Sequence, residues 1–145
     1  MSGLPDIIRE VRRWIEKAEN DRRNAEYVLT MKHGCPTDTV CFHCQQCAEK
    51  YLKAALIFQG KPFPRSHDLN LLANLLGEMP FQQLRNGMQR LNLYSSEPRY
   101  PGEWEPTSRA QAEQALEWAM EIRDAVRSLL PGEALSPETG SFDGV

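Results

Sequence analysis

The stretch TVCFHCQQCAEKYLKAALIFQ, residues 39–59, decides the fold class of this chain. Helical spacing places its small and apolar side chains along one side, which predicts a helix with one face in a protein core. The residues on that face are Cys41, Cys44, Cys47, Ala48, Tyr51, Leu52 and Ala55. Gly60, Pro62 and Pro64 end the helix, because glycine permits a left-handed cap and each proline removes a hydrogen-bond donor.

Four further segments carry the same helical periodicity, and no strand pattern or internal repeat occurs. They cover residues 6–31, 69–76, 81–96 and 109–130. The fourth predicted helix, residues 81–96, contains Gly87, which costs about 1 kcal/mol relative to alanine. Thr107 and Ser108 supply the cap of the fifth. We therefore predict an all-α protein, an antiparallel up-and-down bundle of four to five helices over residues 1–130, with a disordered tail over residues 131–145.

Length and charge exclude several classes of protein. A chain of 145 residues is about the size of one domain, so a two-domain enzyme is not expected. The net charge of −3 gives no electrostatic basis for wrapping a nucleic-acid duplex, although it is compatible with a small phosphate-bearing ligand. The sequence has no secretory signal and no apolar run long enough to span a membrane. We expect a soluble cytoplasmic protein that does not bind a membrane.

The cysteines raise the question of a metal site. Four of them, Cys35, Cys41, Cys44 and Cys47, lie within thirteen residues, and His33 and His43 are close by. Zinc sites usually take such spacing from a turn, where the chain can fold around the ion. Here three of the cysteines belong to the core face of a helix, so we predict that they are packing residues and that the protein holds no metal and no cofactor.

A polar stripe runs along the same helix. Gln46, Glu49, Lys50 and Lys53 follow one another at helical spacing and fall on one face. One interpretation is a solvated face with an ion pair between Glu49 and Lys53. The other is one wall of a groove, in which an amide, a carboxylate and two ammonium groups bind a phosphate or a base edge.

Two other places could contribute to such a groove. His67 precedes Asp68 at a helix start, where Asp68 is expected to cap the first turn and His67 could act as a proton donor or phosphate contact. Arg99 and Tyr100 lie in a loop whose prolines restrict the backbone. That loop would present a bidentate phosphate binder beside an aromatic ring, or would tie itself to a helix end through the arginine.

Together these segments resemble the HEPN domain family of small all-helical proteins. The similarity covers roughly residues 10 to 128 and includes the run Phe42–Leu56. The other matching residues are Trp14, Ala18, Asp21 and Ala25, the run Ser66–Leu69, and Arg99–Pro101. The resemblance implies a dimeric helical bundle that binds a nucleotide or RNA and is often found with a minimal nucleotidyltransferase chain. Positions 44 and 47 are commonly alanine in similar sequences, which agrees with core cysteines.

Some members of the family are toxins that cleave RNA without metal, using an arginine followed four to six residues later by a histidine. That pair is absent here. We therefore predict a dimer that binds a nucleotide or RNA phosphate and acts with a nucleotidyltransferase partner in a toxin–antitoxin-like or regulatory system. Its site would contain Gln46, Glu49, Lys50, Lys53, His67, Arg99 and Tyr100.

Within this site, lysine and arginine would hold the phosphate, Tyr100 would stack on a base and Gln46 would hydrogen-bond to it. Two alternatives stay open. The chain could be a metal-independent ribonuclease in which His67 is the general acid or base and Arg99 stabilises the developing charge. It could also be a non-catalytic interaction module that holds a partner through an apolar groove.

Overall fold

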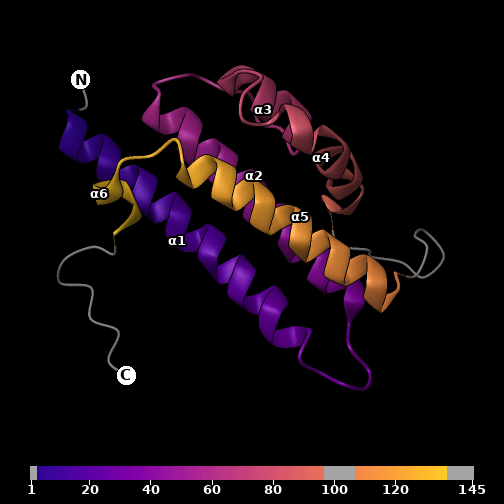
Figure 1. Ribbon diagram of the computed structural model, residues 1–145. Helices are drawn as coiled ribbons and strands as arrows, with labels where there is room; N and C mark the ends of the chain where they lie inside the picture. Colours follow the sequence, from indigo (N-terminus) through magenta and orange to yellow (C-terminus); the bar gives the residue numbers. More distant parts are fainter. Residues whose placement is uncertain (1–2, 97–106, 137–145) are drawn as a thin grey trace, which may run out of the picture.

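The computed structural model describes residues 3–96 and 107–136 and is all-helical over these residues (Figure 1). Three long helices run side by side, and shorter ones pack around them. The long helices are α1 (Leu4–Val28), α2 (Thr37–Phe58) and α5 (Arg109–Arg127). The shorter elements are α3 (Leu69–Leu76), α4 (Arg85–Leu91), α6 (Gly132–Leu135) and the 3-10 turns Gln82–Leu84 and Asn92–Tyr94. The predicted all-α bundle is confirmed.

Helix α2 is the centre of the bundle, because it contacts α1, α3, α4 and α5. It runs antiparallel to α1 and in the same direction as α5, since the segment with α3 and α4 crosses from one to the other (Figure 1). The predicted core face is confirmed: Cys41, Cys44 and Cys47 are fully buried. Burial raises the pKa of Cys41 to about 11 and that of Cys47 to about 12, so both are neutral thiols at pH 7.

Two predicted caps are present. Asp68 Oδ1 accepts hydrogen bonds from the backbone amides of Asn70 and Leu71, at 3.0 and 3.3 Å, and so begins α3. Ser108 Oγ accepts from the Gln111 amide, while the Gln111 side chain accepts from the Ser108 amide. This reciprocal pair is a capping box, and it fixes the start of α5.

The fourth predicted helix is shorter than expected. Residues 81–96 form a 3-10 turn, the seven-residue helix α4 and a second 3-10 turn instead of one helix. Gly87 lies in α4 where that helix meets Trp118 of α5, and a Cβ atom at position 87 would lie 2.6 Å from Trp118 Cδ1. The glycine is therefore required by the close approach of the two helices.

We predict that Gly87→Ala lowers the free energy of unfolding by about 1–2 kcal/mol, although alanine is the better helix former. The added methyl group would push the Trp118 ring out of its place. Asn86→Ala in the same helix, at an exposed position, is the matched control and should change stability by less than about 0.5 kcal/mol. Urea denaturation of both variants measures the difference, and a Gly87→Ala protein as stable as the control would contradict this packing.

Regular structure continues beyond residue 130, where we predicted that the bundle ends. Residues 131–136, predicted to belong to a tail, contain α6, which packs against α1. Ala134 is buried, and Arg12 Nε donates a hydrogen bond to the Glu133 carbonyl oxygen at 2.8 Å. This short helix carried no periodicity that the sequence could reveal, because it has only four residues. Residues 137–145 lie outside the described residues.

Candidate binding site

Two histidine–carboxylate pairs lie on one side of α2. His43 Nδ1 is 2.7 Å from Asp21 Oδ1 of α1, and His67 Nδ1 is 2.8 Å from Glu49 Oε1. Carboxylates only accept hydrogen bonds when ionised, so each Nδ1 carries the proton. The second ring nitrogen, Nε2, is then the atom through which each imidazole can meet a ligand.

Each carboxylate also binds a lysine through its second oxygen. Lys50 Nζ lies 2.6 Å from Asp21 Oδ2, and Lys53 Nζ lies 2.9 Å from Glu49 Oε2. Two neighbouring glutamines, Gln45 and Gln46, lie between the two pairs in the sequence and bond to each other. We call the whole group the paired-histidine site. It consists of Asp21, His43, Gln45, Gln46, Glu49, Lys50, Lys53 and His67.

The predicted polar stripe is thus brought together, but it is not a solvated face. Only 4% of Glu49 and 9% of Lys53 is exposed, which makes that interpretation wrong. The ion pair expected between these two residues is present. Lys53 Nζ also lies 5.9 Å from the ring centroids of both Trp14 and Phe63, so its ammonium group is held by aromatic rings as well.

Hydrogen bonding keeps Glu49 ionised despite its burial. Burial alone would raise the pKa of this carboxyl, but hydrogen bonds from Lys53, His67 and Gln45 outweigh it and lower the pKa. The charges of Asp21 and Glu49 cancel those of Lys50 and Lys53. A phosphate would therefore depend on the two imidazoles, each of which adds one positive charge when protonated.

The two histidines differ in their access to solvent. The side chain of His67 is 65% exposed and that of His43 is 24% exposed. His67 lies directly before Asp68, the residue that caps α3. Asp68 Oδ1 also accepts a hydrogen bond from Asn92 Nδ2 at 3.0 Å. The site is therefore a partly covered patch in which the His67 ring is exposed to solvent. Buried Glu49 holds this ring through its hydrogen bond to Nδ1.

Sequence reasoning missed three members of the site, namely Asp21, His43 and Gln45, as ligand-facing or supporting residues. One signal was available: His43, Gln46, Lys50 and Lys53 follow one another at spacings of three, four and three residues, so the stripe begins one turn earlier than we predicted. Arg99 and Tyr100 lie outside the described residues, and their convergence with the site stays a prediction. Among the residues that the structure does describe, no cluster of three or more histidine, cysteine or acidic side chains could hold a metal ion.

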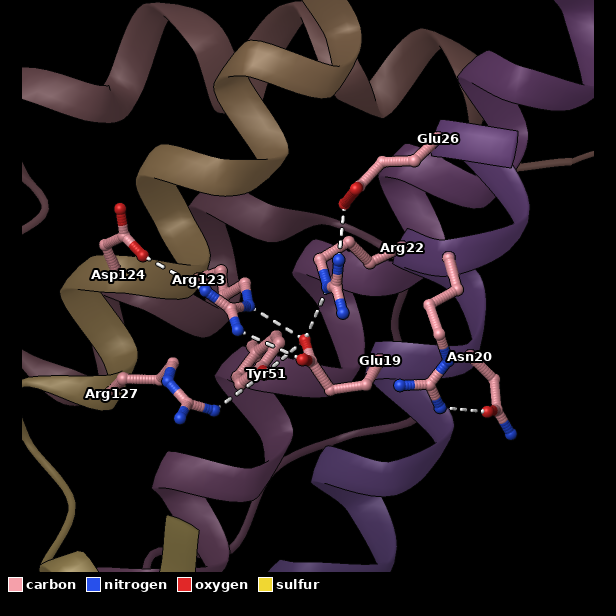
Figure 2. A network of polar contacts seen from close by, with 9 residues as sticks. Glu19, Asn20, Arg22, Glu26, Tyr51, Arg123, Asp124 and Arg127 are labelled. Carbon is pink, nitrogen blue, oxygen red and sulfur yellow. Dashed lines mark hydrogen bonds and ion pairs between the residues drawn. The ribbon is translucent and has the colours of Figure 1, made fainter. Parts of the chain in front are cut away.

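A second polar network joins the three long helices (Figure 2). Glu19 of α1 accepts hydrogen bonds from Arg123 Nε at 2.8 Å, Arg123 Nη2 at 3.0 Å and Tyr51 Oη at 2.7 Å. Arg22 Nε donates to the same carboxylate at 3.2 Å, and Arg127 Nη1 donates to the Tyr51 hydroxyl at 3.2 Å.

This network acts as a structural clamp. Burial alone would raise the pKa of Glu19, but hydrogen bonds from Arg123, Tyr51 and Arg22 lower it from 4.5 to about 2. Glu19 and Asp21 are two residues apart on α1, and both bind side chains of α2. Glu19 accepts a hydrogen bond from Tyr51. Asp21 accepts one from Lys50. The clamp thereby fixes the position of α1 against α2, on which the Asp21–His43 pair depends.

A helical bundle of this kind, with histidine–carboxylate pairs beside its central helix, defines a class of small helical protein. Comparison with known proteins identifies that class further. A family model described as the HEPN domain matches residues 11–129. No helix in the described part of the chain is long and apolar enough to cross a bilayer.

Three known proteins are similar to the chain over most of its length. The protein named "Putative toxin MJ1304" of Methanocaldococcus jannaschii is 30% identical over 139 residues, which covers 85% of this chain and 90% of that protein. The crystal structure of ST0689, described as an archaeal HEPN homologue, has 29% identity and a TM-score of 0.65, covering 81% of this chain and 95% of that one. The crystal structure of TT1696 from Thermus thermophilus has 27% identity and a TM-score of 0.67, covering 83% and 98%, respectively. This chain belongs to the HEPN domain family, as its sequence pattern predicted.

Proposed function

We propose that this HEPN protein binds a nucleotide or an RNA phosphate at the paired-histidine site. The observation that carries the proposal is the pair of imidazoles whose Nδ1 atoms are both held by carboxylates, at 2.7 and 2.8 Å. With Nδ1 fixed, Nε2 of each protonated ring is a charge-assisted donor for phosphate oxygens. Lys50, whose side chain is 25% exposed, shares the Asp21 carboxylate with His43, so the two side chains belong to the same patch.

The relatives support a biological setting for this binding. The similarity to a protein named as a toxin supports a toxin-like role, in a toxin–antitoxin-like or regulatory system. The family resemblance supports a homodimer and a minimal nucleotidyltransferase chain as the partner. In this proposal Arg99 holds phosphate and Tyr100 stacks on a base.

Calorimetric titration with AMP and with a short single-stranded RNA, both in EDTA, tests the binding. His43→Asn and His67→Asn should each weaken binding by about tenfold, because asparagine can still donate to the carboxylate but lacks the outer Nε2. His33→Asn, at an exposed turn residue, is the matched control and should bind like the wild type. Unchanged affinity in both site variants, or no binding by the wild type, would contradict the proposal.

A second candidate function is metal-independent cleavage of RNA. It is favoured by the Glu49–His67 pair, because a carboxylate on Nδ1 orients an imidazole so that Nε2 can act as a general acid or base. Arg99 would stabilise the negative charge that develops on the phosphorane oxygens. A gel of the RNA after incubation with the protein in EDTA tests this function. Cleavage by the wild type that is lost in His67→Asn supports a ribonuclease, and intact RNA after incubation with the wild type contradicts it.

A further inference from the structure

The orientation of the Gln45 amide is fixed by its neighbours. Gln45 is fully buried, and its Nε2 lies 3.1 Å from both Glu49 Oε1 and the backbone carbonyl oxygen of His67. A carbonyl oxygen and an ionised carboxylate both accept hydrogen bonds and donate none. Turning the amide over would place Gln45 Oε1 against these two oxygens, so only the amino group can face them. Gln45 Oε1 must therefore point the other way.

The fixed orientation of the Gln45 amide also fixes the orientation of the Gln46 amide. Gln46 Nε2 donates to Gln45 Oε1 at 2.7 Å, and the reverse orientation would bring two oxygens to that distance. One N–H of the Gln46 amino group is thus committed to Gln45, and the amide cannot turn over. Gln46 is partly exposed, and none of the described residues donates to its Oε1. Gln46 Oε1 is therefore a fixed acceptor toward a ligand.

We infer that the Gln45–Gln46 pair makes Gln46 a specificity-determining residue that selects nucleobases carrying an exocyclic amino group. An amino group, such as N6 of adenine or N4 of cytosine, donates to Gln46 Oε1. A base without a donor at that place leaves the glutamine oxygen desolvated and unpaired, which weakens binding. This inference rests on the proposed function, because it requires that the paired-histidine site binds a nucleotide.

Two pairs of nucleotides that differ only in the amino group test the selection. AMP is compared with purine riboside 5′-monophosphate, and CMP with the corresponding pyrimidin-2-one riboside 5′-monophosphate, by calorimetry. The wild type should bind the amino-bearing member of at least one pair about tenfold more tightly. Gln46→Met should bind both members of that pair equally, while Gln59→Met, at an exposed position where α2 ends, should keep the preference.

A third variant tests the origin of the selection. Gln45→Met keeps Gln46 but frees its amide to rotate, so the ratio of the two dissociation constants within that pair should fall toward one. Equal binding of both members of each pair by the wild type would overturn this inference and leave the proposed function intact. A preference that survives in Gln46→Met would also overturn it. Failure of all four nucleotides to bind would overturn the proposed function and this inference together.

Discussion

Glu19→Gln is expected to lower the free energy of unfolding by about 3 kcal/mol at pH 7. The carboxylate is the shared acceptor of Arg22, Tyr51 and Arg123, and its side chain is only 15% exposed. Glutamine has nearly the same shape but no charge, so it would leave two partly buried guanidinium groups without their common counter-charge. A loss of about 3 kcal/mol corresponds to a fall in Tm of roughly 6–12 °C for a chain of this size.

Glu16→Gln is the matched control for this variant. Glu16 lies one turn earlier on α1 but is exposed, so its substitution should change stability by no more than about 0.5 kcal/mol. Chemical denaturation of both proteins, followed by circular dichroism, gives the two free energies. If Glu19→Gln is as stable as Glu16→Gln, the polar network of Figure 2 does not clamp the helices.

Acid should remove the same stabilisation from the wild type. The pKa of Glu19 is about 2 in the folded protein and 4.5 ordinarily, so its contribution is complete above pH 4.5 and is lost as the pH falls toward 2. Allowing for solvent screening of a partly exposed carboxylate, we expect about 2 kcal/mol to disappear over that interval. The stability difference between wild type and Glu19→Gln should therefore shrink from about 3 to about 1 kcal/mol.

The measurement is the free energy of unfolding of both proteins at intervals between pH 7 and pH 2. Other carboxylates also gain protons in this range, among them Glu49, whose pKa is lowered as well. Because those groups are common to both proteins, they cancel in the difference between the two curves. Curves that stay parallel down to pH 2 would show that Glu19 is not the residue whose protonation weakens the clamp.

Much of the fold could be predicted because periodicity reports which side of a helix is buried. The core face of α2 is an example: Cys41, Cys44 and Cys47 lie at spacings of three residues, and all three are buried. Local signals also identified the caps at Asp68 and Ser108. The close approach of α4 and α5 was not predictable in this way, since it depends on Trp118 of α5 meeting Gly87.

The candidate site was predicted only in part, for a related reason. Spacing on one helix placed Gln46, Glu49, Lys50 and Lys53 together, but it could not show which of them another element covers. Glu49 and Lys53 are buried because His67 and the Phe63 ring close over them from the loop before α3. Asp21 comes from α1, so its bond to His43 depends on how α1 and α2 pack.

The most direct test of the binding account uses the three histidines of the chain as reporters. Imidazole ¹H–¹⁵N spectra are recorded while AMP is added to the wild-type protein in EDTA. We predict that the ring signals of His43 and His67 shift together and saturate at the same nucleotide concentration, while those of His33 stay in place. If neither His43 nor His67 responds, or if His33 shifts as much as they do, the paired-histidine site is not the nucleotide site.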